Sequence, residues 1–112
     1  MTARDAIGRA VRVVVDRPLG SRHPAHPDMV YSVNYGWVEG VTGGDGEGQD
    51  AYILGVDAPI ERFEGAVIAV IHRRDDVEDK WVVAPPGMAF APDAIRAATW
   101  FTERYFDSEI VI

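Results

Sequence analysis

The chain has 112 residues, of which 47% are hydrophobic and none is cysteine, and its formal net charge is −7. This length predicts one domain, residues 1–112, with one core, and the absence of cysteine excludes disulfides, thiolate metal sites and cysteine nucleophiles. The acidic balance argues against nucleic acid as a partner, because a duplex attracts a basic face. No apolar run is long enough to cross a bilayer and the N-terminus has no apolar signal core, so we expect a cytoplasmic protein without membrane contact.

Short β-rich segments follow one another along most of the chain and are separated by glycine, proline or charged residues. Predicted strands cover residues 11–16, 31–40, 51–56, 65–72 and 81–84. Within residues 31–40, alternation would place Tyr31, Val33, Tyr35 and Trp37 on one face, which predicts a contribution to the core. The two tyrosine hydroxyls are alternatively available to a ligand anion. Gly36 predicts a bulge or a close approach of two backbones.

Residues 92–105 form the one segment with helical periodicity. Proline suits the first helical position, and the negative charge of Asp93 in the first turn favours the helix dipole. An apolar stripe predicted to lie on the sheet consists of Ile95, Ala98, Phe101 and Tyr105. The apolar tail, residues 109–112, would pair with a sheet edge or with a neighbouring subunit, so a homo-oligomer is possible. These elements predict a mainly β (α+β) fold, a small five-stranded OB-like β-barrel with one C-terminal helix.

Two acidic loops carry the candidate chemistry. Asp45, Glu47 and Asp50 lie in a glycine-rich loop that lets carboxylates converge, and a second charged turn contains Asp75, Asp76, Glu78 and Asp79. Hard cations such as Mg²⁺ bind oxygen ligands of this kind, often together with substrate phosphates. The alternative is a pair of solvated acidic turns. If both tips lie at one end of the barrel, their carboxylates can share a cation.

A histidine pair in the loop of residues 22–28 invites a zinc interpretation. His23 and His26 are three residues apart, a spacing that brings side chains together on a helix. Pro24 and Pro27 argue against a helix here, so a zinc site is not favoured.

In order and spacing, these segments resemble a soluble (family I) inorganic pyrophosphatase. Residues 31–38, YSVNYGWV, are similar to the family's Y-x-x-N-Y-G-Y segment, and residues 45–50, DGEGQD, to its D-x-D-P-x-D signature. Residues 78–85, EDKWVVAP, are similar to the D-x-K segment that begins a strand ending in proline, and residues 95–107, more weakly, to the C-terminal helix. The resemblance implies hydrolysis of pyrophosphate to two phosphates with Mg²⁺ as the cofactor.

The resemblance also implies roles for individual residues. The implied metal ligands are Asp45, Asp50 and one of Glu78 and Asp79, with Asp75 as a further candidate. Glu47 would accept a proton from the attacking water. Phosphate oxygens would be held by Tyr31, Tyr35, Lys80 and Tyr105 with an arginine, Arg17 or Arg22, and Asp16 would close the site.

Departures from the family pattern leave two other functions open. Glu47 stands where the family has aspartate, Gly48 where it has proline and Phe106 where it has lysine, and Arg17, Arg22 or His23 would have to replace the family's other phosphate-binding residues. One alternative is a hydrolase of another phosphoanhydride or phosphate ester. The other is a non-catalytic OB-like module that binds a cation or a small phosphorylated anion.

Overall fold

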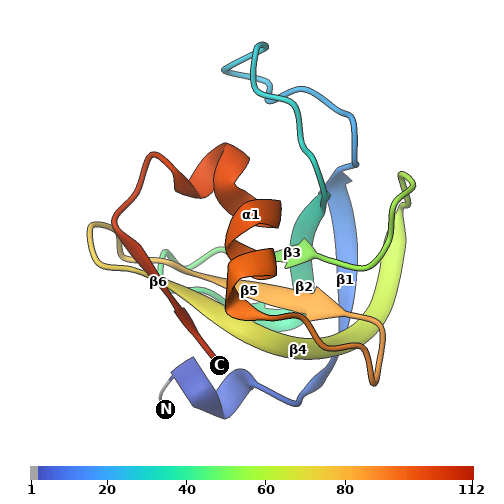
Figure 1. Ribbon diagram of the computed structural model, residues 1–112, viewed down its shortest axis with the longest axis vertical. Coiled ribbons are helices and arrows are strands. Elements are labelled where there is room, and N and C mark those ends of the chain that lie inside the picture. Colours follow the sequence, from blue (N-terminus) through green and yellow to red (C-terminus); the bar gives the residue numbers. More distant parts are fainter. Residues whose placement is uncertain (1–2) are drawn as a thin grey trace.

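Five strands close into a barrel in the computed structural model, which describes residues 3–112 (Figure 1). They are β1 (Ala10–Arg17), β2 (Asn34–Thr42), β3 (Gly48–Ile53), β4 (Arg62–Arg73) and β5 (Asp79–Ala84). The strands are ordered β1-β2-β3-β5-β4, and antiparallel pairing of β1 with β4 closes the ring. Only β3 and β5 run parallel among these pairs. The predicted five-stranded barrel with one C-terminal α-helix is confirmed.

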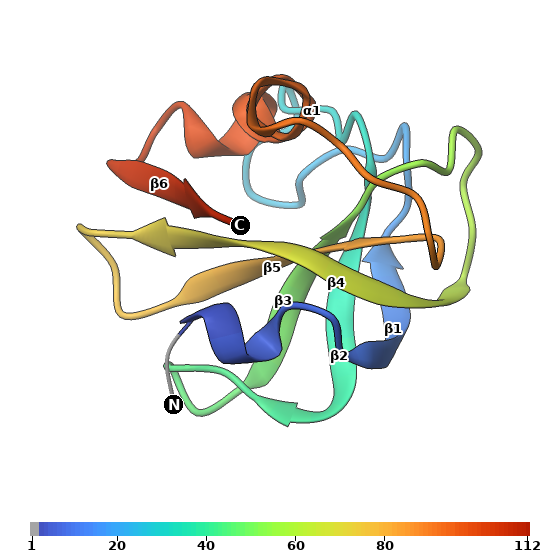
Figure 2. The ribbon, with the colours of Figure 1, turned by 60° about the horizontal axis from the view of Figure 1, so that its bottom comes forward.

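Three further elements lie outside the barrel ring. They are the 3₁₀ helix η1 (Ala3–Ala6), the helix α1 (Pro92–Glu103) and the strand β6 (Ser108–Val111). Figure 2 shows α1 on one side of β4 and β5, and η1 on the other. Strand β6 pairs antiparallel with β4, which confirms that the apolar tail adds to a sheet edge. Within residues 3–112, no helix is long and apolar enough to span a membrane.

The hydrophobic residues form two cores, one on each side of the sheet. Ala51 and Ile53 of β3 face the barrel interior, whereas Tyr52 packs in the layer beneath α1 with Ile71 and Ile95. Alternate residues of a strand point to opposite faces, so β3, β4 and β5 are buried on both. This burial explains why residues 65–72 read as an almost continuous apolar run.

Single-residue bulges interrupt two of the strand pairs. Val67 pairs with Val83 but Ala69 pairs with Val82, so Ile68 is an extra residue in β4. Likewise Val15 pairs with Gly36 and Arg17 with Tyr35, which leaves Asp16 as an extra residue in β1. Bulges bend a strand and redirect side chains. The Asp16 bulge thereby turns this carboxylate out of the regular alternation.

The predicted close approach at Gly36 is confirmed. A Cβ at this position would overlap the carbonyl oxygen of Val14 on the neighbouring strand. Only glycine allows β1 and β2 to pass this closely, beside the Asp16 bulge.

Residues 31–40 contribute to the core as predicted, although the strand starts later than predicted. Strand β2 begins at Asn34, three residues later. Val33 and Tyr35 pack in the core beneath α1, whereas Trp37 is 38% exposed. Val38, one residue on, faces the barrel interior.

The helix ends two residues before the predicted end. It stops at Glu103, whose carboxylate is buried, and the chain then turns through hydrogen bonds from Tyr105 N to Thr102 O and from Phe106 N to Glu103 O. Tyr105 is therefore 60% exposed and not part of the apolar stripe. The buried positions of α1 are Ile95, Thr99 and Glu103.

Candidate functional site

The two acidic loops meet at one end of the barrel, as predicted. Gln49 Nε2 donates to the carbonyl oxygen of Asp79 at 2.7 Å. Gly44 lies against the carbonyl of Val77, so closely that a Cβ would overlap it. The parallel pairing of β3 with β5 explains this, because the two loops precede strands that start side by side.

Lys80 is the centre of the cluster that results. Its ammonium contacts Asp50 Oδ2 at 2.6 Å and Glu78 Oε2 at 2.9 Å, and its side chain is only 5% exposed. A cation that is buried this deeply requires such charged partners. Asp50 and Glu78 therefore share a cation, and that cation is the Lys80 ammonium.

The other three carboxylates of the second loop are engaged elsewhere. Asp76 Oδ2 lies 3.2 Å from Arg73 Nη1. Asp79 Oδ1 lies 2.8 Å from His72 Nδ1, and Asp75 Oδ2 accepts from Asp107 N at 3.1 Å. Of the two rivals Glu78 and Asp79, it is Glu78 that converges with Asp50. Within residues 3–112, no group of three or more histidine, aspartate or glutamate side chains is placed to hold a metal ion by protein ligands alone.

Asp45 and Glu47 stand at the exposed tip of the first loop. Asp45 Oδ1 accepts from Glu47 N at 3.0 Å, an arrangement in which an aspartate mimics a backbone turn. Gly43 N also donates to Glu47 O at 2.7 Å and closes the loop. Asp50, in contrast, is held on strand β3.

Two tyrosines lie beside the Lys80 cluster. The centroid of the Tyr35 ring is 5.8 Å from Lys80 Nζ. Burial raises the pKa of the Tyr35 hydroxyl far above the usual range. The neighbouring Asp50, to which this hydroxyl is hydrogen-bonded, raises the pKa further. The ring centroids of Tyr31 and Tyr35 are 5.6 Å apart. Burial also raises the pKa of Tyr31, although the charge and hydrogen bond of Arg17 oppose the shift. Both hydroxyls thus remain protonated donors.

Asp16 joins this end of the barrel through its bulge, whereas Arg22 does not. Burial raises the pKa of Asp16; Arg17 opposes the shift and the Asp50 charge adds to it. This coupling indicates that the two carboxylates are near one another. Arg22 Nη1 instead donates to the carbonyl of Pro27 at 2.7 Å and stays within its own loop.

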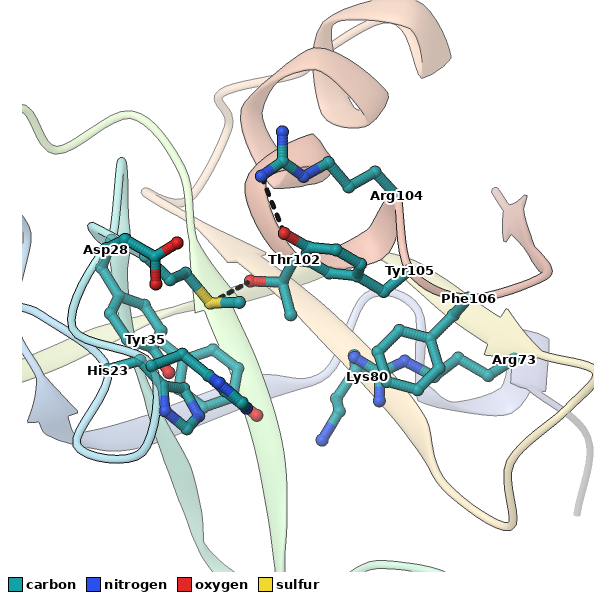
Figure 3. A pocket seen from close by; sticks show the side chains of 12 residues that line it. His23, Asp28, Tyr35, Arg73, Lys80, Thr102, Arg104, Tyr105 and Phe106 are labelled. Atoms are coloured by element: carbon teal, nitrogen blue, oxygen red, sulfur yellow. Dashed lines mark hydrogen bonds between the residues drawn. The ribbon is translucent and has the colours of Figure 1, made fainter.

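A pocket of about 490 Å³ opens next to Lys80. We call the Lys80 end of this pocket, with Tyr35 and Arg73, its floor, and the lining includes one acidic side chain, Asp28. Figure 3 shows Tyr35 and His23 on one side, and Thr102, Tyr105 and Phe106 on the other. The remaining lining residues are His26, Met29, Tyr31 and Arg104. Four of the seven predicted phosphate-side residues line it or its floor, namely Tyr31, Tyr35, Lys80 and Tyr105; Asp16, Arg17 and Arg22 do not.

The sequence interpretation missed a buried network below the pocket. Arg73 donates to Glu103 through Nη2 at 2.6 Å and through Nε at 3.1 Å, and Tyr52 OH donates to Glu103 Oε2 at 2.6 Å. Phe106 covers the Arg73 guanidinium, with 3.6 Å between the guanidinium carbon and the ring centroid. A signal was present: Glu103 follows Ile95 and Thr99 at four-residue intervals, on the buried face of the helix.

Asn34 is a second residue whose role the sequence did not reveal. It is fully buried, and its Oδ1 accepts from Leu19 N at 2.8 Å while its Nδ2 donates to Ala58 O at 2.9 Å. These bonds anchor the start of the hairpin, residues 18–31, that forms the His23 wall of the pocket.

Solved structures with the same architecture include inorganic pyrophosphatases. The enzyme from Ehrlichia chaffeensis matches with a TM-score of 0.68 and 15% identity over 97% of this chain and 88% of its own. The enzyme from Neisseria gonorrhoeae matches with a TM-score of 0.66 and 21% identity over 94% of this chain and 78% of its own. The enzyme from Coxiella burnetii matches with a TM-score of 0.66 and 15% identity over 98% of this chain and 88% of its own. No protein-family model and no curated protein sequence matches the chain. At these identities the likeness shows the fold, and the chain accordingly has a pyrophosphatase-like barrel.

Proposed function

We propose that this protein hydrolyses inorganic pyrophosphate to two phosphates with the help of Mg²⁺. The observation that carries the proposal is the position of Lys80. Its ammonium touches Asp50 and Glu78 on one side and lines a pocket with Arg73, Arg104 and only one acid on the other. A carboxylate pair beside a basic pocket is the charge pattern that a cation and a polyphosphate require together.

The donor set fits a magnesium ion that arrives with its anion. Mg²⁺ is usually bound by one or two carboxylates and substrate phosphates rather than by a complete protein cage. Asp50 and Glu78 supply such a pair, and their convergence on Lys80 Nζ marks a position where positive charge is stabilised. Asp16, near Asp50 on the β1 bulge, is the third carboxylate of this end of the barrel. Asp45 remains a proposed further ligand from the adjoining loop.

When bound, the ion would neutralise phosphate oxygens and lower the pKa of a coordinated water. The chain's own groups would orient the anion. Lys80 would turn from the two carboxylates towards phosphate oxygens, and the Tyr35 and Tyr31 hydroxyls would donate hydrogen bonds to them. Glu47, exposed on the loop that lies against Val77, is the proposed acceptor of the water's proton.

The direct test is Mg²⁺-dependent phosphate release from pyrophosphate. Asp50→Asn should abolish it, and Glu47→Gln should reduce it by about 10²–10⁴-fold, as expected for loss of a general base. Asp93→Asn, an exposed acid on the first turn of α1, is the matched control and should keep the wild-type rate. Wild-type protein that releases no phosphate above background with Mg²⁺ or Mn²⁺ would contradict the proposal.

One observation favours a second candidate, a non-catalytic module for a small phosphorylated anion. The Lys80 ammonium lies at the point where Asp50 and Glu78 converge, so this candidate needs no metal ion to hold the two carboxylates together. This candidate predicts pyrophosphate binding that does not require Mg²⁺ and no turnover. Cytoplasmic location and a homo-oligomer remain predictions from the sequence.

A further inference from the structure

We propose that the pocket takes a nucleoside diphosphate, so that the physiological substrate carries a planar aromatic ring on its phosphoanhydride. This inference rests on the proposed function, because it specifies what is attached to the diphosphate that the Lys80 end would hold. It goes beyond hydrolysis of bare pyrophosphate, for which the aromatic walls of the pocket have no use.

The size of the pocket is the first observation. At about 490 Å³, it falls within the range of roughly 300–1,000 Å³ in which proteins bind drug-sized organic ligands. Two linked phosphates held by Lys80 and Tyr35 would occupy only the floor. The space between the walls is left for a further group covalently attached to the anion.

The hairpin wall presents flat rings to that space. The His23 ring is nearly parallel to Tyr31, at 8° with centroids 6.3 Å apart, and His26 lies 5.0 Å from His23. Ala25 N donates to His23 Nδ1 at 3.0 Å, which fixes this ring. Preordered aromatic surfaces of this kind stack on nucleobases with little dependence on the base.

The opposite wall offers a second platform and a cation. The Arg104 guanidinium lies 4.9 Å from the Tyr105 ring centroid, and its Nη2 donates to the Tyr105 hydroxyl at 2.8 Å. The pair stays at the rim although Tyr105 is 60% exposed. Thr102 Oγ1 lies 4.0 Å from Met29 Sδ and links the two walls, as Figure 3 shows.

Charge sets the orientation of the ligand. The diphosphate would lie at Lys80, beside the carboxylates that attract the cation, and the base would lie between the aromatic walls, where Asp28 can accept a hydrogen bond from a base amine. In the reaction, the water oxygen bonds to the terminal phosphorus and the bond from that phosphorus to the bridging oxygen breaks. The products are a nucleoside monophosphate and inorganic phosphate, and the water's proton passes to Glu47 and from there to solvent.

The test compares two non-hydrolysable probes, α,β-methylene-ADP and methylenediphosphonate, by calorimetry with Mg²⁺. Stacking on an aromatic side chain is typically worth about a tenfold gain in affinity or more, so we expect the wild type to prefer the nucleotide by that factor. His26→Ala, at an exposed residue, should remove most of this preference. Trp100→Ala, at an exposed aromatic on the outer side of α1 that is absent from the pocket lining, should keep it.

The outcomes separate this inference from the proposed reaction. Nucleotide preference that depends on His26, in a protein that does not hydrolyse pyrophosphate, supports the ligand class while the pyrophosphatase reaction fails. Equal binding of both probes overturns the ligand class, even if pyrophosphate is hydrolysed. A preference that survives His26→Ala and Tyr105→Ala also overturns it, because the walls would then contribute nothing.

Discussion

Arg73 and Glu103 form a buried ion pair that joins the end of β4 to the end of α1, with 2.6 Å between Arg73 Nη2 and Glu103 Oε2. Both side chains are at most 5% exposed. Burial opposes a charged Arg73, but the hydrogen bonds and the charge of Glu103 raise its pKa well above the usual value. The pair thus places the helix end, and with it one wall of the pocket, on the barrel.

Removing one partner of this pair should cost far more than removing a surface charge next to it. Glu103→Gln should lower the free energy of unfolding by about 3 kcal/mol, because it leaves the buried Arg73 guanidinium with a single charged partner, Asp76, 3.2 Å from Nη1. Asp107→Asn is the matched control, since it breaks the exposed Arg74–Asp107 pair at 2.8 Å, and it should cost much less. Urea unfolding measures both, and equal costs would show that the buried pair does not hold the helix end.

Alkaline pH should destabilise the protein through its buried tyrosines. Burial and then Glu103 raise the pKa of Tyr52 well above its ordinary value of 10.0, so the folded state keeps a proton that the unfolded chain loses. The free energy of unfolding keeps its full value below about pH 10. At higher pH it decreases by up to about 1.4 kcal/mol per pH unit for each buried tyrosine. Tyr52→Phe should flatten this decline in unfolding experiments from about pH 8 to about pH 11. An unchanged slope would mean that Tyr52 does not titrate with unfolding.

Phe106→Lys should destabilise the protein, although lysine is the residue expected from the family pattern. The phenylalanine ring covers the Arg73 guanidinium at 3.6 Å, an attraction worth about 1 kcal/mol that an ammonium would replace by repulsion. We expect a lower melting temperature for Phe106→Lys than for Phe106→Leu, which removes the ring without adding charge. The reverse order would show that the contact with Arg73 is unimportant.

Gly36 should not tolerate a side chain. Gly36→Ala would force a Cβ into the carbonyl oxygen of Val14, at a cost of at least about 2 kcal/mol for the backbone shift required. In Gly43→Ala, the added Cβ would lie 3.5 Å from its nearest neighbouring atoms, which is an ordinary contact. This variant should therefore change stability little. Thermal melts of the two variants provide the comparison, and a Gly36→Ala protein as stable as the wild type would contradict the close packing of β1 and β2.

Replacing Lys80 should turn the carboxylate pair into a stronger cation site. Lys80→Met leaves Asp50 and Glu78 without their shared ammonium, so the apo protein should be less stable and should bind Mn²⁺ more tightly than the wild type does. Ion binding to the folded state raises stability in proportion to RT ln(1 + [L]/Kd). The melting temperature as a function of Mn²⁺ concentration tests this. A smaller Mn²⁺ effect in Lys80→Met than in the wild type would place the cation site elsewhere.

The strands were predictable because β-branched and apolar residues mark them directly. The limits of the prediction lie where tertiary contacts override local pattern. Residues 31–33 have strand composition, yet the strand begins at Asn34, whose buried amide is fixed by bonds to Leu19 and Ala58. The helix pattern continues to Tyr105, yet the helix stops at Glu103, whose buried carboxylate accepts hydrogen bonds from Arg73 and Tyr52.

The candidate site was predictable as a set of segments but not as a set of contacts. Motif spacing assigned Asp50, one of Glu78 and Asp79, and Lys80 to one site, and the structure brings Asp50, Glu78 and Lys80 together. It could not show that Asp75 and Asp79 have other partners, Asp107 and His72. Nor could it place the histidine loop, because a hairpin without regular secondary structure leaves no periodic signal.

The pairing of β4 with β1, β5 and β6 has a consequence for how the molecule opens. Amide hydrogens of residues 66–71 lie between paired strands and two cores, so they should exchange with solvent only when the whole protein unfolds. The hairpin of residues 18–31 is tied by the Arg22–Val30 bridge and short turns, so its amides should exchange through local opening. One wall of the pocket therefore belongs to the least protected part of the chain, while its floor, at Lys80, belongs to the most protected. A ligand can reshape the wall without loosening the barrel that holds Asp50 and Glu78 in place.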